Sequence, residues 1–244
     1  MQTAESEARM AHIARVARNE ERLAAAGAPV VMAPPVAPVR LLPRYLEAVS
    51  AAMRTRRATL DAALSELEMR HSQVIAEAAA LLVATVRAGG KILAAGNGGS
   101  AAQAQHFAGE FVGRFKRERA AYPMLSLTVD TSIITAIAND YSYHDVFARQ
   151  VEALGQSGDL FIAISTSGKS ENLLRAARAA RERSMPVIAI TGERRSPLGQ
   201  QADLTIRAPS ADTAIAQELH TLIVHILCDI AEQELAARAG GGWE

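Results

Sequence analysis

The sequence contains a single cysteine, Cys228, and no net charge. One cysteine cannot form an intramolecular disulfide, and no Cys-x-x-Cys pair is present, so a disulfide framework and a thiolate zinc site are both excluded. Lys plus Arg (26) equals Asp plus Glu (26), so no overall field draws the chain toward nucleic acid or an anionic membrane, and neither is predicted as a partner. Any ligand must be held by a local site. The cysteine usage fits a reducing cytoplasm.

Long apolar runs and a secretory leader are also missing. The longest apolar stretches, such as residues 78–86, fall short of the roughly 18 residues that span a bilayer. The first residues carry acidic side chains such as Glu5 and Glu20 among arginines, with no apolar core before a cleavage site. We therefore predict a chain that has no transmembrane helix and is not exported.

The 244 residues, 49% hydrophobic and 21% charged, are enough for one large domain or two small ones. Residues 1 to about 27 are rich in Ala, Arg and Glu and predict a short, weakly amphipathic helix, and the four prolines between residues 29 and 38 predict a semi-rigid linker. Residues 1–40 are thus predicted to form an amino-terminal helical appendage. The domain is predicted at residues 41–238, followed by a flexible tail at 239–244 that contains three glycines.

The spacing of apolar residues changes after Gly89-Gly90. Before it, between residues 41 and 87, they recur at three- and four-residue steps, which predicts two helices or one broken helix. After it, strands are predicted at residues 91–95, 124–128, 160–164, 187–191 and 204–206, with helices near 100–114, 131–138, 171–183 and 213–237. Such alternation predicts an α/β fold with a five-stranded parallel sheet flanked by helices, flavodoxin-like, that binds ligands beyond the carboxyl ends of its strands.

The first predicted strand runs into the glycine loop, Gly96–Ser100, which opens a helix. Unpaired N–H groups and the helix dipole at such a position favour an anion. The loop matches neither the dinucleotide nor the Walker pattern, so it does not specify a nucleotide. A plain tight turn is the alternative interpretation.

The third predicted strand ends in the serine loop, residues 165–170, with the sequence STSGKS. Its four hydroxyls and its backbone donors can surround a phosphate without a cationic cage. Alternatively, Ser170 only caps the next helix, but one cap does not need four hydroxyls, so we predict that this loop binds the phosphate of a sugar. A third polar segment, Asn139-Asp140, either ends a helix or hydrogen-bonds sugar hydroxyls.

His106 and Glu110 lie four residues apart in the helix that follows the glycine loop. Their side chains therefore project from one helix face about one turn apart. A histidine and a carboxylate at this spacing can share a divalent metal or transfer protons to one substrate. A solvent-facing pair is the alternative, but Phe107, Ala108 and Gly109 between them are apolar or small, which argues against a wet face.

The last predicted helix carries Gln217, Glu218, His220 and His225 among apolar residues. Polar groups in so apolar a helix need partners when they are buried. A purely structural role is the alternative for His220. Gln217 and His225 are eight residues apart, about 12 Å along a helix axis, so they converge on one ion only by reaching toward each other, unless different subunits contribute them.

Four motifs occur in order: GNGGSAAQAQHFAGEFVGRF, AIANDYSY, ISTSGKS and DTAIAQELHTLIVH. Together they resemble the phosphoheptose isomerases of the sugar isomerase (SIS) domain family over roughly residues 45–236. The resemblance implies a single SIS domain with N-terminal helices, in an enzyme that interconverts sedoheptulose 7-phosphate and D-glycero-D-manno-heptose 7-phosphate. It further implies a homotetramer with active sites between subunits, often with zinc. Two departures from the family pattern are Gln103 for an aspartate and Ile215-Ala216 for Arg-Ile.

The resemblance also implies roles for single residues. The predicted substrate contacts are Asn97, Gly98, Gly99, Ser100, Glu110, Asn139, Asp140, Ser165, Thr166, Ser167, Ser170 and Gln217. The predicted zinc ligands are His106, Glu110, Gln217 and His225. Glu110 and His225 are the predicted proton-transfer pair, acting through an enediol. Two alternatives stay open: a non-catalytic SIS tetramer that binds a partner such as a replication initiator, and an isomerase of another sugar phosphate.

Overall fold

The structure is a computed structural model that describes residues 42–236. The predicted appendage at residues 1–40 and the predicted tail at 239–244 lie outside the described residues. By its internal contacts the chain divides into two units, residues 1–53 and 54–244. Of the first unit only the beginning of helix α2 is described, and the sheet with its covering helices belongs to the second.

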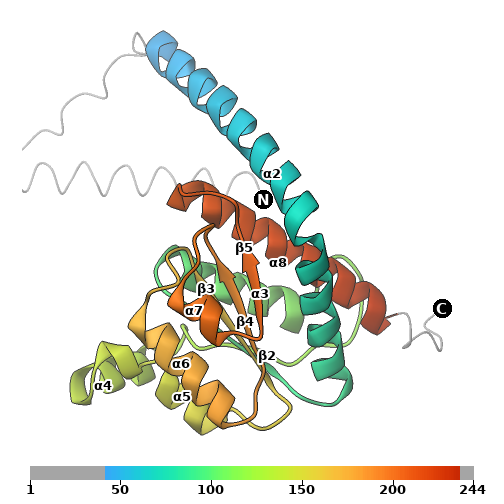
Figure 1. Cartoon of the computed structure of the whole chain (residues 1–244), viewed down its shortest axis with the longest axis vertical. Helices are drawn as coiled ribbons and strands as arrows, with labels where there is room; N and C mark the ends of the chain where they lie inside the picture. The colour runs from blue at the N-terminus through green and yellow to red at the C-terminus, as the bar shows by residue number, and fades with distance from the viewer. Residues whose placement is uncertain (1–41, 237–244) are drawn as a thin grey trace, which may run out of the picture. The chain divides into compact units, whose positions relative to one another are not determined.

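A five-stranded parallel sheet, in the order β2-β1-β3-β4-β5, forms the centre of the second unit (Figure 1). The strands are β1 (Ile92–Gly96), β2 (Met124–Ser126), β3 (Leu160–Ser165), β4 (Val187–Thr191) and β5 (Leu204–Arg207). This flavodoxin-like order reverses between β1 and β3, the place where ligands bind in open α/β sheets. The predicted fold class and all five predicted strands are confirmed.

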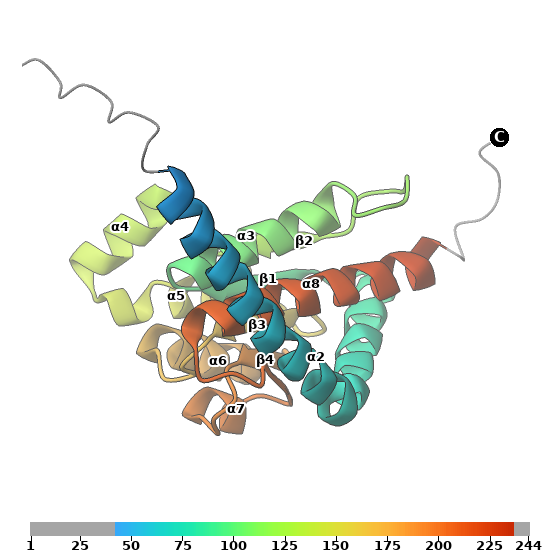
Figure 2. The ribbon, with the colours of Figure 1, turned by 90° about the horizontal axis from the view of Figure 1, so that it is seen from above.

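Strands β1, β3 and β4 are buried along their whole length, which explains their nearly continuous apolar sequences. Successive residues point to opposite faces of the sheet. Ile162 and Ile164 pack in the core formed with α2, α3 and α8, whereas Phe161 and Ala163 pack in the core formed with α5, α6 and α7. Figure 2 shows α3 and α8 lying side by side over the sheet, a contact that positions the site described below.

Helices connect the strands and cover both faces. They are α2 (Leu42–Arg87), α3 (Gly99–Val112), α4 (Thr131–Asp140), the 3-10 helix η2 (Tyr143–Asp145), α5 (Ala148–Leu154), α6 (Glu171–Glu182), α7 (Pro197–Gln201) and α8 (Thr213–Ala236). The prediction of two helices or a broken one between residues 41 and 87 is wrong: α2 is continuous, since neither Gly nor Pro occurs from residue 44 to 87. The short elements η2, α5 and α7 were not predicted, because they show too little periodicity.

Helix α8 is the one helix among residues 42–236 that is long and apolar enough to cross a membrane. Counting unbroken apolar runs missed it, because His220, His225 and Asp229 interrupt its apolar residues. Half of its most apolar window is buried inside the fold (50%), where Ile223 and Leu227 join the core under α2 and α3. Its apolar composition is accounted for by this packing.

Candidate active site at the carboxyl ends of the strands

The glycine loop joins β1 to α3 and lies against the side chain of Gln217. Gly98 has a φ of 56°, a left-handed conformation that favours glycine. A Cβ atom on Gly99 would collide with the Gln217 amide, so a larger residue there would displace that side chain. Two of the predicted substrate contacts, Gly99 and Gln217, are thereby placed side by side. Ser100, another predicted contact, is buried at the start of α3.

Asn97 ties the glycine loop to helix α6. Its amide exchanges two hydrogen bonds with the buried Asn172 amide, at 3.0 and 2.9 Å, and its Oδ1 also accepts one from the Tyr143 hydroxyl at 2.9 Å. Neither Asn172 nor Tyr143 was among the predicted site residues. The available signal was weak: a single asparagine in the first turn of the helix that follows the serine loop.

The serine loop joins β3 to α6, and the hydroxyl at the N-cap position of α6 does not cap that helix. Ser165 Oγ accepts a hydrogen bond from the Gly168 N–H at 3.1 Å, and Ser167 Oγ accepts one from the Lys169 N–H at 3.3 Å, so these hydroxyls shape the turn. Ser170 occupies the N-cap position of α6, but its hydroxyl makes no capping hydrogen bond. The alternative that the Ser170 side chain only caps the helix is therefore wrong, and its hydroxyl is available to a ligand.

His106, Glu110 and His225 meet where α3 runs beside α8. The two histidine Nε2 atoms lie 2.8 Å apart, and His106 Nε2 lies 3.6 Å from Glu110 Oε1. One potential ligand atom from each of the three residues can be chosen so that all lie within 4.8 Å of one another. A single chain brings these three predicted residues together, with no need for a second subunit. Gln217 lies at the glycine loop, and its role as a metal ligand stays a prediction.

The three side chains suit a zinc ion. Two imidazole nitrogens and a carboxylate oxygen are ligands that zinc prefers, and tetrahedral coordination with ligand distances of about 2.0–2.1 Å needs ligand atoms about 3.3 Å apart. The separations of 2.8 and 3.6 Å bracket that value. Three protein ligands would leave a fourth position for substrate, water or the Gln217 amide.

The face that carries His106 and Glu110 is open. The side chain of His106 is 44% exposed and that of Glu110 is 21% exposed. The apolar or small residues between His106 and Glu110 predicted a face shielded from water, and for this single chain that prediction is wrong. Phe107 points away from this face into the core, where it is fully buried. A ligand can reach the cluster directly from solvent.

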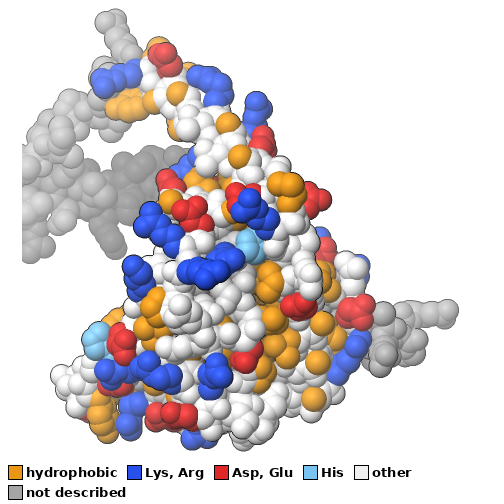
Figure 3. All heavy atoms as spheres, in the orientation of Figure 1, with side chains coloured by type: hydrophobic (Ala, Val, Ile, Leu, Met, Phe, Trp, Pro, Cys, Tyr) orange, Lys and Arg blue, Asp and Glu red, His pale blue; other side chains and the backbone are white. Residues whose placement is uncertain are grey.

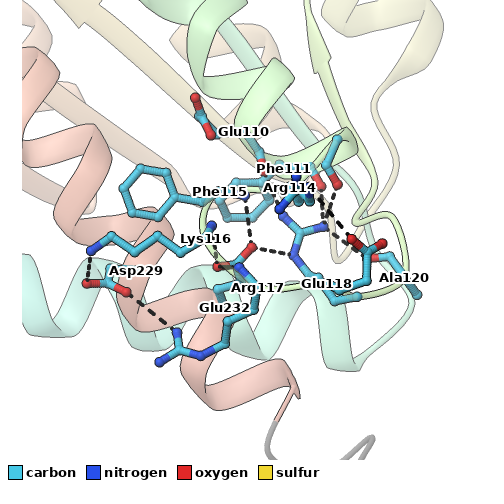
Figure 4. A network of polar contacts seen from close by, with 12 residues as sticks. Glu110, Phe111, Arg114, Phe115, Lys116, Arg117, Glu118, Ala120, Asp229 and Glu232 are labelled. Carbon is cyan, nitrogen blue, oxygen red and sulfur yellow. Dashed lines mark hydrogen bonds and ion pairs between the residues drawn. The ribbon is translucent and has the colours of Figure 1, made fainter. Parts of the chain in front are cut away.

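The loop that follows α3 carries Phe115, whose ring lies 5.3 Å from the His225 ring, at an angle of 31° between their planes. Figure 4 shows how Glu232 holds this loop. Its carboxylate accepts hydrogen bonds from three successive backbone N–H groups, those of Phe115, Lys116 and Arg117, at 2.8–2.9 Å. The loop behind His225 is therefore anchored to α8.

Arg119 completes this anchor. Its guanidinium donates to Glu232 Oε1 at 3.0 Å and to the carbonyl of Glu110 at 2.6 Å, and the two charged side chains are 4% and 1% exposed. Burial by itself raises the pKa of Glu232, but the backbone donors and Arg119 outweigh it and hold the pKa below its usual value. Neither Arg119 nor Glu232 was predicted from the sequence, although a glutamate in so apolar a helix is a signal of a buried polar contact.

Asn139 and Asp140 form the end of α4. The Asn139 amide donates to Asp140 Oδ1 at 2.8 Å, and both residues are exposed. Within residues 42–236, no hydrogen bond or ion pair joins them to the glycine loop or the serine loop. The structure shows them as the helix terminus, and contact with substrate stays a prediction for both.

His220 has the structural role that the sequence left open. Its ring is fully buried, and Nε2 donates to the Thr191 carbonyl at 3.0 Å. Burial lowers its pKa, so the imidazole is neutral near pH 7. The residue joins α8 to the end of β4 and does not belong to the His106, Glu110 and His225 cluster.

A parallel sheet with these two loops at its carboxyl edge, and with a His/Glu/His cluster between α3 and α8, defines an SIS-type sugar-phosphate domain. Residues 57–192 match the family model described as SIS domain. A curated relative, the phosphoheptose isomerase of Thiobacillus denitrificans, is 54% identical over 164 residues, 66% of this chain and 83% of the relative. The chain belongs to the phosphoheptose isomerases of the SIS-domain family and is an isomerase.

Two solved structures agree with this assignment. The phosphoheptose isomerase from Neisseria gonorrhoeae is 40% identical, with a TM-score of 0.71 over 76% of this chain and 99% of that one. The phosphoheptose isomerase from Francisella tularensis is 38% identical, with a TM-score of 0.72 over 78% of this chain and 98% of that one. The fold is therefore shared along nearly the whole length of both relatives.

Proposed function

We propose that the chain interconverts sedoheptulose 7-phosphate and D-glycero-D-manno-heptose 7-phosphate. The observation that carries the proposal is the meeting of His106, Glu110 and His225 between α8 and α3, the helix that follows the glycine loop. The relatives that bear the name phosphoheptose isomerase support the substrate. A non-catalytic interaction module is not favoured, because it would have no use for a metal-ligating and proton-transferring cluster.

The phosphate group is held at the serine loop, where backbone N–H groups at the start of α6 and the hydroxyls of Thr166, Ser167 and Ser170 act as donors. The sugar extends from there across the switch point between β3 and β1 toward the glycine loop and Gln217. This places the carbonyl end of the sugar beside α3 and α8. The phosphate thus anchors one end while the chemistry takes place at the other.

Isomerisation moves a proton between neighbouring carbons. Glu110 removes a proton from C1 of the ketose while His225, in its protonated form, gives one to the C2 oxygen, which produces the enediol. Glu110 then returns its proton to C2, and the C1 hydroxyl loses its proton to His225, so that the aldose forms and both residues regain their starting states. One ligand atom of Glu110 and one of His225 lie within 4.8 Å of each other, close enough for both side chains to act on one substrate.

Zinc fits the cluster, with His106, Glu110 and His225 as ligands and Gln217 as the predicted fourth. When bound, zinc supplies a Lewis acid that polarises substrate oxygens. A carboxylate bound tightly to zinc would be a weaker base, so the role of Glu110 as a ligand would compete with its role as the general base. Arg119, which donates to the Glu110 backbone carbonyl, holds the residue in place in either case.

The chain is proposed to act as a homotetramer in the cytoplasm. The early part of α2 exposes apolar side chains at three- and four-residue steps: Tyr45, Leu46, Val49 and Met53. Contiguous apolar residues on a helix face are a usual sign of a surface covered by another chain.

The free thiol of Cys228 is buried and its pKa is raised by burial, which suits a reducing compartment.

The function is tested by following aldose formation from sedoheptulose 7-phosphate with purified protein. We expect turnover of this substrate, and for unphosphorylated sedoheptulose a kcat/KM at least 100-fold lower, since the serine loop then has no phosphate to hold. No turnover of sedoheptulose 7-phosphate, with turnover of a different sugar phosphate, would assign the same chemistry to another substrate. Equal rates for both sugars would contradict the role of the serine loop.

The metal site makes a separate prediction. Purified wild-type protein should contain or take up about one zinc per chain, and zinc added after chelation should raise the Tm, because the ion binds only the folded chain. His106→Gln should lose this zinc-dependent rise, whereas His144→Gln, at an exposed histidine on η2, should keep it. Elemental analysis and thermal denaturation measure both effects. A wild-type protein that neither contains nor binds zinc would remove the metal from the proposal.

A further inference from the structure

A cavity of about 300 Å³ adjoins the serine loop, between that loop, the loop from β4 to α7 and the beginning of α8. The sheet order determines this arrangement: β3 carries the serine loop, β1 with the glycine loop is its neighbour on one side, and β4 is its neighbour on the other. Thr166 and Ser167 line the cavity, together with the loop from β4 to α7 and the beginning of α8. No residue of the glycine loop and no member of the His106, Glu110 and His225 cluster lines it.

The cavity is rich in positive charge. Lys169, Arg194 and Arg195 line it, and Glu193 is the one carboxylate among its lining residues. Within the described part of the chain, none of these three cations forms an ion pair. Their charges are therefore available to a ligand, in a chain whose total charge is zero.

The positive surface continues beyond this cavity. Arg195 also lines two neighbouring hollows, of about 300 and 250 Å³, and Arg207 at the end of β5 lines both of them. Figure 3 shows Lys and Arg side chains gathered on the face over β5 and α7. The cations beside the serine loop thus belong to a local concentration of basic groups on one face.

A single phosphate ester does not require these cations. Hydroxyl groups and backbone N–H groups of the serine loop are sufficient donors for it, as in the proposed function. Guanidinium groups add bidentate recognition of further phosphate oxygens. A second phosphoryl group attached to the first would extend from the serine loop into the cavity that shares Thr166 and Ser167.

We infer that the serine loop and this cavity together bind a diphosphate group, with one phosphoryl on the loop and the second between Lys169, Arg194 and Arg195. The ligand is either inorganic pyrophosphate or a diphosphate ester, and it competes with the sugar phosphate because both use the serine loop. The inference rests on the proposed function in one respect: the serine loop must hold a phosphate.

Calorimetric titration of the full chain with inorganic pyrophosphate and with inorganic phosphate tests this. We expect wild-type protein to bind pyrophosphate at least tenfold more tightly than phosphate. The double variant Arg194→Gln, Arg195→Gln should lose at least tenfold in pyrophosphate affinity and less than twofold in phosphate affinity. The matched control is Arg57→Gln, at an exposed arginine on α2, which should change neither affinity by more than twofold.

Other outcomes separate the inference from the proposed function. Equal affinities for the two anions, or a parallel loss of both in the double variant, would overturn the diphosphate site while leaving isomerase activity intact. Failure of the wild type to bind or convert any sugar phosphate would overturn both. Methyl diphosphate distinguishes the two sources: binding as tight as pyrophosphate supports a diphosphate ester as ligand, whereas binding of pyrophosphate alone supports the free anion.

Discussion

Glu110→Gln is expected to lower the kcat for aldose formation by about 10²–10⁴-fold, the usual contribution of a general base. The amide has nearly the shape of the carboxylate, so KM should change little, but it cannot accept the proton from carbon. Glu110 is the one carboxylate in the cluster with His106 and His225, so neither of the other two members can replace it with a group of the same kind. Steady-state kinetics with sedoheptulose 7-phosphate measures the effect.

Two further measurements distinguish a role of Glu110 as general base from a role as metal ligand alone. In D₂O the wild type should incorporate deuterium at C2 of the aldose, the carbon that receives a proton from Glu110, and Glu110→Gln should not, even when its zinc content is restored. Glu118→Gln is the matched control, because Glu118 is an exposed glutamate on the following loop, paired at 3.7 Å with Arg114. A kcat within threefold of wild type for Glu110→Gln would assign the proton transfer to another group.

Glu232→Gln is expected to destabilise the chain by about 3–5 kcal/mol, as removal of one partner from a buried ion pair usually does. The variant leaves the Arg119 guanidinium buried without a countercharge and weakens three hydrogen bonds to backbone N–H groups. For a chain of this size the Tm should fall by roughly 6–20 °C. Thermal and denaturant unfolding measure the change.

The same carboxylate makes stability depend on pH. Its folded-state pKa lies below its usual value, so its contribution is complete above the unfolded value of about 4.3 and decreases as the pH falls through the folded pKa. The wild type should therefore lose stability below about pH 4 more steeply than Glu232→Gln, since the variant has no carboxyl group to titrate there.

Asp229→Asn is the matched control for Glu232→Gln. Asp229 lies one turn earlier on α8 and pairs with Lys116 of the same loop at 2.9 Å, but its side chain is 30% exposed and that of Lys116 is 57% exposed, so its removal should cost less than about 1 kcal/mol. The loop carries Phe115 against His225, and Glu232→Gln should also reduce kcat at temperatures where the protein is still folded. Equal stability of the two variants would show that the buried pair contributes no more than a surface one.

Sequence periodicity alone determined most of the architecture. Buried parallel strands appear as short apolar runs, and the alternation of such runs with amphipathic helices leaves few possible topologies, so the five strands and the longer helices could be predicted. The two candidate phosphate loops were also found, because glycines and hydroxyls directly follow a strand. His106 and Glu110 could be paired from their spacing, since both lie on one helix.

Only the tertiary structure decided which distant residues meet. The family resemblance implied that His225 joins His106 and Glu110, and the structure shows the physical cause, which is that α8 packs beside α3. Asn172 meets Asn97 because β3 and β1 are neighbours, and nothing in the sequence predicted that contact. No periodicity within one segment encodes such contacts. The buried pair of Arg119 and Glu232 depends on where a loop lies against a helix more than a hundred residues away. Local pattern determines the elements of this chain, whereas the packing of its helices on the sheet determines its chemistry.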